Sequence, residues 1–355
     1  MAGVCLILLV CYKAPVTQPP RSVDVAIVGG GFAGMATAWW LSRCGVHDVI
    51  VLEREAELGR FASGRSAGLG RQLAEDDLTT GLTVTGAAQL REHFAPAWTE
   101  TGGILTFDNV EHARGYAARA QRFGLPTERL DRAQVLAHWP QLATIEIAAA
   151  LFVPSDGLID IHALLAAYAE GRRVLLETAV ERVIATARGA TLLTSRGSFV
   201  ARVVVDATGA WAGRTTGDPL LASYKRHVYV LEAAAQDRVP FVWHLGESEL
   251  YVRAIDGKIM VSPCDGTKVE PGDQQPDPAG EVLMRTRLAA SSLATANVAK
   301  AWACQRTFSP LLAMKLERDA TRPWLVWAAG LGGHGATGSS AVGETVARLV
   351  LDALG

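Results

Sequence analysis

Three glycines and one carboxylate near the start of the chain have the spacing of a dinucleotide-binding motif. Gly29, Gly31 and Gly34 form a G-x-G-x-x-G sequence, and Glu53 follows further along. The first glycine permits a tight turn, the second lets a pyrophosphate approach the backbone, and the third allows a helix to pack closely on a strand. A helix that begins there offers free N–H groups to phosphates, and Glu53 can accept hydrogen bonds from an adenosine ribose. This chemistry predicts binding of FAD or NAD.

The sequence around these residues supplies the elements that must position them. An apolar strand begins at Val23, an amphipathic helix follows the glycines, and a second apolar strand ends on Glu53. A glycine motif alone is weak evidence, and the alternative is a glycine-rich turn without a ligand. The order of strand, turn, helix and acid favours the nucleotide site.

Composition limits the class of protein. The 355 residues are 49% hydrophobic and 20% charged, with a net charge of −2, which is typical of a well-buried enzyme of two packed domains. The charges are scattered, so neither nucleic acid nor an anionic membrane is expected as a partner. Five widely spaced cysteines without a CxxC pair predict no metal site and no disulfide framework, and they suit a cytoplasmic location.

Residues 1–22 are expected to be an extension ahead of the first core strand. The apolar run Val4–Val10 is too short to span a bilayer, which takes about 20 residues. It also lacks the preceding basic residues and the cleavage site of a secretory signal. A weak anchor or export signal is the less favoured alternative.

Periodicity predicts alternating helices and strands along the rest of the chain. The predicted helices are Leu78–Phe94, Ala113–Phe123, Arg132–Trp139, Ile161–Glu170 and Ser339–Leu354. The predicted strands are a β-meander over Val174–Asp206, then Val228–Ala233, Leu250–Arg253, Lys258–Ser262 and Leu325–Ala329, with a hairpin turn at Asp256-Gly257.

These elements predict an α/β fold with α+β insertions, made of two interleaved domains. The nucleotide domain is expected to comprise residues 23–80, 145–215 and 305–355, and a β-rich substrate domain residues 81–144 and 216–304. The stretch Gly330–Gly335 repeats the G-x-G-x-x-G pattern, but too few residues follow it for a second strand with a ribose-binding acid. It is better interpreted as a loop whose backbone contacts a flat ring, and a single nucleotide domain is expected.

Four motifs in order resemble the D-amino acid oxidase/sarcosine oxidase family of FAD enzymes. They are the N-terminal fingerprint ending in Leu52-Glu53-Arg54-Glu55, the loop Ser63–Gly68, the turn Ala207–Trp211, and Gly330–Glu344. The loop and the hairpin region look most similar to bacterial D-arginine dehydrogenases. The resemblance implies a glutathione-reductase-like FAD-binding Rossmann domain with an interleaved antiparallel β-sheet substrate domain. It also implies oxidation of a C–N bond to an imine by hydride transfer to flavin N5, in a family that needs no side-chain base.

The resemblance and the fingerprint together assign a set of cofactor contacts. These are Gly29, Gly31, Phe32, Ala33, Gly34, Glu53, Arg54, Ser63, Arg65, Ser66, Ala67, Val180, Ala207, Gly209, Trp211, Cys304, Gly332, Gly333, His334, Gly335, Ala336 and Thr337. A helix N-terminus at Gly335–Ser339 would stabilise negative charge on a reduced flavin.

Two residues match the family's carboxylate-binding positions. Arg306 is similar to the arginine that holds the substrate carboxylate, and a guanidinium fork suits that role. Tyr251 matches a tyrosine that donates its hydroxyl to the same group, although it could equally be an aromatic residue of a buried strand. Arg226 is a further possibility, but Lys225-Arg226-His227 is better interpreted as a solvated turn. His334 is included as a substrate contact, with packing against the flavin ring as its alternative.

Several positions depart from the family pattern. Thr337 replaces a carboxylate-binding lysine of sarcosine oxidases, and Phe61 with Leu69 or Gly70 replaces a histidine and a tyrosine of D-arginine dehydrogenases. These changes favour a more apolar or differently shaped amine. Cys304 lies where sarcosine oxidases carry the cysteine joined to the flavin, so a covalent link is a hypothesis, with a small buried cysteine as the alternative.

The sequence therefore predicts an FAD-dependent oxidase or dehydrogenase. Its substrate would be a D-amino acid, glycine, an N-substituted amino acid or a related amine, with oxygen or another electron acceptor to reoxidise the flavin. One alternative is a 2-hydroxy acid or polyol-phosphate dehydrogenase, with His244 or His227 as the base. Another is a flavin-binding protein without turnover of its own.

Overall fold

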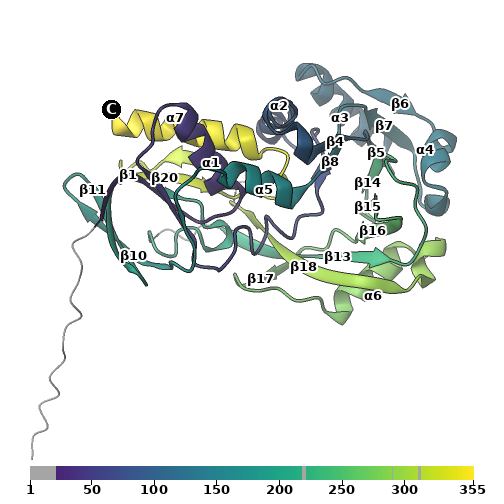
Figure 1. The fold of residues 1–355 in the computed structure, drawn as a ribbon. Coiled ribbons are helices and arrows are strands. Elements are labelled where there is room, and N and C mark those ends of the chain that lie inside the picture. Colours follow the sequence, from purple (N-terminus) through teal and green to yellow (C-terminus); the bar gives the residue numbers. More distant parts are fainter. Residues whose placement is uncertain (1–20, 218–220, 290, 311–312) are drawn as a thin grey trace, which may run out of the picture.

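The computed structural model describes residues 21–217, 221–289, 291–310 and 313–355. The predictions for most of the N-terminal extension lie outside these residues. Two large β-sheets divide the described chain, one with eight strands and one with nine, and they lie in opposite halves of the molecule (Figure 1). A small three-stranded sheet is formed by β3 (Leu69–Gly70), β8 (Gly157–Ile159) and β4 (Trp98–Glu100).

The first sheet contains the predicted nucleotide-binding unit. β1 pairs in parallel with β2 and with β12, β2 pairs with β9, and β12 pairs with β20. The antiparallel strands β10, β11 and β19 extend it. Its strands are β1 (Arg21–Val28), β2 (Val49–Leu52), β9 (Val174–Leu175), β10 (Val180–Thr186), β11 (Gly189–Thr194), β12 (Gly197–Asp206), β19 (Lys315–Arg318) and β20 (Leu325–Ala329).

Helices α1 (Phe32–Arg43), α5 (Ile161–Ala169) and α7 (Ser339–Leu354) lie together on one face of this sheet (Figure 1). Small residues allow α1 and α7 to approach closely, because a Cβ on Gly343 would lie 2.5 Å from the backbone carbon of Ala36. The alternate side chains of β1 divide between two cores, with Val25 and Ile27 facing the helices and Ala26 and Val28 facing the meander side. A strand buried on both faces is typical of a parallel sheet.

The second sheet has the strand order β17-β13-β16-β15-β14-β5-β7-β6, and β18 pairs with the other edge of β13. Its pairs are antiparallel except for β14 with β5. The strands are β5 (Gly103–Phe107), β6 (Glu128–Leu130), β7 (Ala149–Val153), β13 (Ala222–Leu231), β14 (Phe241–Leu245), β15 (Leu250–Ile255), β16 (Lys258–Ser262), β17 (Thr267–Val269) and β18 (Val298–Phe308).

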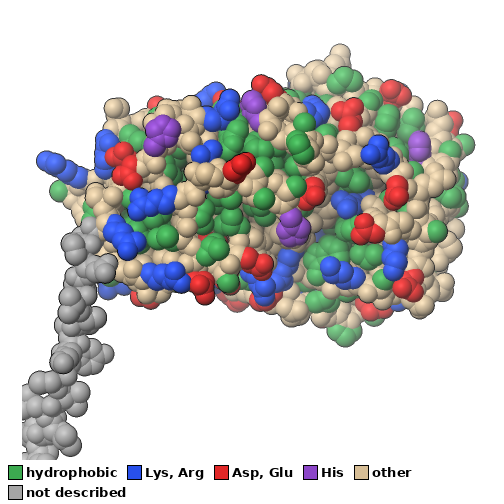
Figure 2. Space-filling model, in the orientation of Figure 1, with side chains coloured by type: hydrophobic (Ala, Val, Ile, Leu, Met, Phe, Trp, Pro, Cys, Tyr) green, Lys and Arg blue, Asp and Glu red, His purple; other side chains and the backbone are tan. Residues whose placement is uncertain are grey.

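Four further helices belong to this half or connect it to the first. They are α2 (Asp77–His93), α3 (Val110–Arg122), α4 (Arg132–His138) and α6 (Pro278–Arg287). Short 3-10 helices are η1 (Ala95–Ala97), η2 (Pro140–Leu142), η3 (Gly209–Trp211) and η4 (Ser292–Thr295). Within the described part of the chain, no helix is both long and apolar enough to cross a bilayer. Figure 2 shows acidic and basic side chains interspersed over the face that it presents (Figure 2).

Most of the predicted elements are confirmed with small shifts of their ends. The helices at α2, α3, α4, α5 and α7, the meander β10–β12, and the strands β16 and β20 all form as expected. The start of the predicted meander is wrong, because Val174–Leu175 forms β9 and pairs in parallel with β2. The structure adds β5, β7, β14 and α6, which were not predicted. The strand residues of β5 and β14 are buried throughout, so they lack the alternation that marks a half-exposed strand.

One local prediction is wrong. Lys225-Arg226-His227 is not a solvated turn but lies inside β13, where Arg226 pairs with Cys304 of β18. Three consecutive polar side chains are typical of a turn in a sequence, but in the fold this segment is paired with residues 303–305 of β18. The predicted domain limits stay a prediction, although β7, in a segment assigned to the nucleotide domain, pairs in the second sheet.

Candidate cofactor and substrate site

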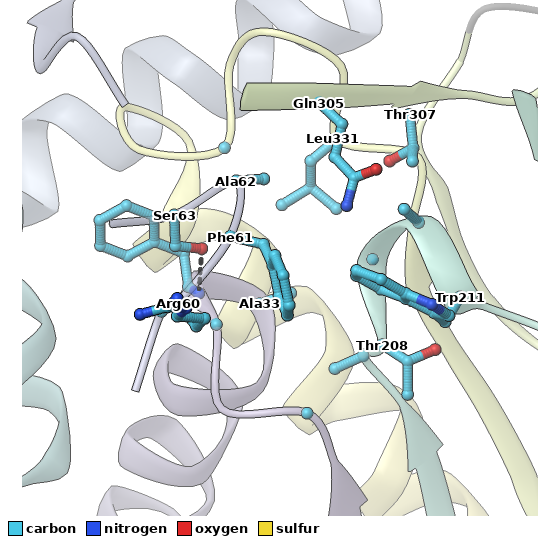
Figure 3. A pocket seen from close by; sticks show the side chains of 18 of the residues that line it. Ala33, Arg60, Phe61, Ala62, Ser63, Thr208, Trp211, Gln305, Thr307 and Leu331 are labelled. Carbon is cyan, nitrogen blue, oxygen red and sulfur yellow. Dashed lines mark hydrogen bonds between the residues drawn. The ribbon is translucent and has the colours of Figure 1, made fainter. Parts of the chain in front are cut away.

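A cavity of about 280 Å³ lies between the first sheet and the second. The glycine turn after β1, the tip of β2, the loop around residues 59–67 and η3 line it from one half. The loop after β20, which also belongs to the first half, lines it as well, and the end of β18 and Tyr251 line it from the other half. Gln305 and Thr307 project from β18 toward the same space as Phe61 and Trp211 (Figure 3). The carboxyl ends of parallel strands are the usual place for a ligand in an α/β sheet.

The backbone of the first turn requires glycine at two positions. Gly29 has a φ of 107°, and a Cβ there would lie 2.5 Å from the carbonyl oxygen of Ala207. A Cβ on Gly34 would lie 2.0 Å from the carbonyl oxygen of Gly29. Gly31 lines the cavity, whereas Gly34 packs behind the turn. At the start of α1 the cavity wall is therefore formed by backbone atoms of glycines, with no side chain between them and the cavity.

The N-terminus of α1 and the carboxylate of Glu53 meet at this turn. Gly31 is the N-cap and has no capping side chain, while the Phe32 N–H donates to Ser63 Oγ at 3.0 Å. Glu53 accepts hydrogen bonds from the N–H groups of Gly30 at 2.7 Å and Glu55 at 2.9 Å, which fix its carboxylate at the cavity edge. These features suit a pyrophosphate and a ribose, respectively.

An aromatic and cationic cluster lies on the same wall. The guanidinium of Arg54 lies 3.9 Å from the ring centre of Trp211, and the Phe61 and Trp211 rings are 4.8 Å apart. Arg65, in contrast, does not line the cavity. Its guanidinium donates to the carbonyl oxygens of residues 274 and 303 and pairs with Asp273 at 2.5 Å, so it joins its loop to the second sheet.

The end of β18 brings four consecutive residues, 304–307, to the cavity. Gln305 Nε2 is buried and has no hydrogen-bond partner among the described residues, so it is a free donor at the wall. Cys304 is buried at the cavity, and desolvation raises the pKa of its thiol. A neutral thiol is a poor nucleophile, so any reaction there needs the ionised form.

Arg306 and Tyr251 are both on the wall that the second sheet provides. Within the described ranges the guanidinium of Arg306 has no hydrogen-bond or ion-pair partner, and it lies 5.8 Å from the ring centre of Trp243. Tyr251 is 1% exposed, and its ring centre is 5.1 Å from that of Trp243. Burial raises the pKa of the Tyr251 hydroxyl, so it stays a hydrogen-bond donor. The pair can bind an anion from two directions.

Two residues of the loop after β20 are turned away from the cavity. His334 Nε2 lies 2.9 Å from Glu75 Oε2 and 3.2 Å from Arg71 Nη2, and burial lowers the pKa of the imidazole. Thr337 donates its hydroxyl to the carbonyl oxygen of Leu69 at 3.1 Å. These bonds hold the loop against β3 and the segment that follows it, whereas the loop backbone at Gly332, Gly333 and Gly335 lines the cavity.

Most residues assigned from the sequence line the cavity, but Gly34, Arg65, His334 and Thr337 do not. The cavity also contains residues that the sequence left unassigned. Thr208 and Thr307 lie beside assigned neighbours, so extending each motif by one residue would have found them. The others are Val28, Leu52, Gly59, Arg60, Phe61, Ala62, Thr178, Ala179, Ala210, Arg214, Thr215, Gln305, Ala328, Gly330 and Leu331.

The two histidines considered as bases for a hydroxy acid are not at the cavity. His244 is buried in β14, where its Nδ1 lies 3.0 Å from Thr106 Oγ1. His227 is buried in β13, with its Nδ1 2.8 Å from Asp265 Oδ2 and its Nε2 accepting the N–H of Asp277 at 3.1 Å. Across the described residues, no group of three or more His, Cys, Asp and Glu side chains could hold a metal ion.

Comparison with known proteins decides the family. A model of the family described as FAD dependent oxidoreductase (DAO) matches residues 24–349. The chain belongs to this family. Membership of the DAO family implies FAD as the cofactor, and the bare glycine turn, the glycine N-cap of α1 and the unpartnered Gln305 Nε2 fit such a group.

Two relatives illustrate the similarity of this DAO-family chain. Mitochondrial sarcosine dehydrogenase of Mus musculus is 28% identical over 244 residues, which cover 61% of this chain and 26% of the mouse protein. Glycine oxidase of Geobacillus kaustophilus is 32% identical over 214 residues, which cover 54% of this chain and 55% of that protein. The match therefore spans about a quarter of the first relative and about half of the second.

Solved structures show the same fold. L-proline dehydrogenase from P. horikoshii superposes with a TM-score of 0.85 at 21% identity, covering 94% of each chain. Glycine oxidase from Geobacillus kaustophilus gives a TM-score of 0.79 at 24% identity, covering 94% of this chain and 95% of that one. The predicted mixed α/β class, an FAD domain with an antiparallel substrate sheet, is thus confirmed.

Proposed function

We propose that this DAO-family protein oxidises the C–N bond of an amino acid or a related amine to an imine. One observation carries the proposal: Arg306 presents a guanidinium without a partner in the described chain, beside the Tyr251 hydroxyl, on the wall of the cavity. Partial removal of a cation from water without a counterion is unfavourable, and a substrate carboxylate offsets that cost. The relatives include enzymes named for glycine and sarcosine, which support an amino acid as the substrate.

Each residue has a distinct role in this proposal. Arg306 binds both oxygens of the carboxylate, and Tyr251 donates a hydroxyl to it, so that the adjacent C–H bond is held in one orientation. The backbone at Gly332–Gly335, where a Cβ on Gly333 would lie 2.9 Å from Arg306 Nη1, and the start of α7, whose N-cap carries no capping side chain, add positive potential. FAD, when bound, accepts the two electrons and the hydrogen that leave the carbon.

The proposed oxidation of the amine to the imine is balanced without a side-chain base. The neutral amine loses hydrogen from carbon with its electron pair, the nitrogen lone pair forms the C=N bond, and the remaining N–H proton passes to water. Water then hydrolyses the imine to a carbonyl compound. Oxygen or another electron acceptor takes up the two electrons.

A 2-hydroxy acid or polyol-phosphate dehydrogenase is less well supported. Removing hydride from an alcohol usually needs a base for the hydroxyl proton. His227 and His244 were the candidates, and both are bonded within the second sheet away from the cavity. A flavin-binding protein without turnover is disfavoured by the free Arg306, which such a role does not need.

Two finer points belong to the proposal. Cys304 lines the cavity, which supports its sulfur as a point of covalent attachment to FAD. The similarity to D-arginine dehydrogenases remains a hypothesis, as does the cytoplasmic location. Phe61 lines the cavity in the region where those enzymes use polar residues, so D-arginine itself is not the preferred substrate.

The proposal is tested by anaerobic reduction of the bound flavin. The purified holoenzyme is mixed with D-amino acids, glycine, N-methyl amino acids and 2-hydroxy acids, and the loss of flavin absorbance is followed. We expect one amine class to bleach the flavin rapidly and Arg306→Ala to lose that response. Bleaching by 2-hydroxy acids alone would replace the proposal with its alternative.

A further inference from the structure

A second arginine lies beside Arg306 on the same face of the nine-stranded sheet. In the β13–β18 pair, Arg226 is opposite Cys304 and Tyr224 is opposite Arg306, so the two arginines are diagonal neighbours. Residues directly opposite each other in antiparallel strands project to one face. The same face can be followed across the neighbouring strands. Val230 of β13 is opposite Met260 of β16, and Ser262 of β16 is opposite Tyr251 of β15. Tyr251 is in turn opposite Trp243 of β14, so Tyr251 and Trp243 project to that face too.

Arg226 has no counterion in the described chain. Its Nε and Nη1 atoms are buried without a hydrogen-bond partner. Burial and the charge of Arg306 lower its pKa, and the other groups that act on it are Cys264, Glu249 and Tyr251. Two guanidinium groups this close repel each other unless anions lie between or beside them.

The nearby carboxylates already have partners. Glu75 binds Arg71 and lies 2.9 Å from His334, and Glu249 accepts a hydrogen bond from Trp243 Nε1 at 2.9 Å. Asp265, which interacts electrostatically with Arg226, accepts the N–H of His227 at 2.7 Å and lies 2.8 Å from His227 Nδ1. A third guanidinium, that of Arg71, lies 4.0 Å from the ring centre of Trp243, with its Nε and Nη1 unpartnered in the described residues. Arg306 lies 5.8 Å from the centre of the same ring and lines the cavity, whereas Arg71 and Arg226 are not among the described cavity-lining residues and lie beside it.

One carboxylate cannot satisfy these donors. Its two oxygens offer about four acceptor positions, and the Arg306 fork with the Tyr251 hydroxyl occupies three of them. Arg226 would then remain buried and charged with at most one bond. A second anion beside Arg226 gives its donors partners and offsets the repulsion from Arg306.

We propose that the substrate carries a second anionic group, a carboxylate that Arg226 binds, so that the preferred amine is a dicarboxylic amino acid. Arg306 and Tyr251 hold the carboxylate next to the reacting carbon, and Arg226 holds the other. The inference rests on the proposed function, because it names the substrate class of the same site. It replaces the more apolar amine that the sequence departures favoured.

The test compares two unreactive ligands of equal chain length, succinate and butyrate. Each is titrated into the FAD-loaded enzyme, and the shift of the flavin absorbance gives its Kd. We expect succinate to bind at least about tenfold more tightly, since a hydrogen-bonded charge pair contributes that much or more. In Arg226→Gln the preference falls to within about threefold, while butyrate binding changes little. Arg306→Gln is the matched control and weakens both ligands.

Equal binding of the two ligands by the wild-type enzyme overturns the inference, whether or not the variant folds. Equal weakening of both ligands by Arg226→Gln overturns it as well, because the two arginines then share one carboxylate. The two proposals fail separately. Bleaching by neutral amino acids with no succinate preference leaves C–N oxidation standing, whereas a succinate preference without bleaching by any amine leaves only the second anion site.

Discussion

Replacing Arg306 with methionine should change ligand affinity and stability in opposite directions. The side chain is half-buried and unpartnered in the described chain, so it provides two charged hydrogen bonds only when a carboxylate is bound. Each such bond contributes about 1.5–3 kcal/mol. Losing both costs about 3–6 kcal/mol, which corresponds to about a hundredfold to ten-thousandfold in Kd.

The free energy of unfolding without ligand should not fall with this substitution. Methionine fills a similar volume, and it removes a half-buried charge that repels Arg226. Replacing unpaired buried charge with an apolar side chain is neutral or stabilising, here by about 1 kcal/mol. An arginine with a purely structural role would give the reverse pattern.

The assay measures both quantities on the same FAD-saturated preparation. Butyrate titration of the flavin absorbance gives the Kd, and urea denaturation gives the free energy of unfolding. Arg306→Lys is the control, because it keeps the charge but loses the fork and should retain an intermediate affinity. Unchanged butyrate affinity in Arg306→Met, with a loss of more than about 2 kcal/mol of stability, would refute the reasoning.

Three other predictions follow from single features of the structure. Gly34→Ala should lower the melting temperature and the ratio of FAD to protein, because its Cβ would lie 2.0 Å from the carbonyl oxygen of Gly29. Gly115→Ala, in helix α3 with no atom in the way, is the control that should leave the FAD ratio unchanged and hold or raise the melting temperature. Burial raises the pKa of Asp156 to about 7, so its protonated form is favoured in the folded state, and stability should decline as the pH rises from about 4 to 7. Asp156→Asn should flatten that decline in melting curves, and an unchanged slope would contradict the assignment. If Cys304 binds FAD covalently, acid precipitation should leave a yellow pellet for the wild type and a colourless one for Cys304→Ser; a colourless wild-type pellet excludes the bond.

The fold was predictable where neighbouring residues carry the signal. The strand, turn, helix and acid of residues 23–53 are contiguous, so their spacing alone fixes the geometry that the backbone of Gly29 and Gly34 then requires. The meander and the hairpin at Asp256-Gly257 were predictable for the same reason, because turn residues interrupt a period of two. β5 and β14 were not, because strands buried on both faces lack that period.

The sequence by itself determined the nucleotide turn, the family and the identity of Arg306 and Tyr251 as the residues to examine. Only the tertiary structure decided which assigned side chains reach the cavity. Arg65 and His334 sit in the expected loops but turn toward Asp273 and Glu75, residues far away in the sequence. Arg226 looked like part of a turn until its pairing with β18 placed it beside Arg306. Side-chain direction depends on partners that folding brings together, and local spacing does not encode them.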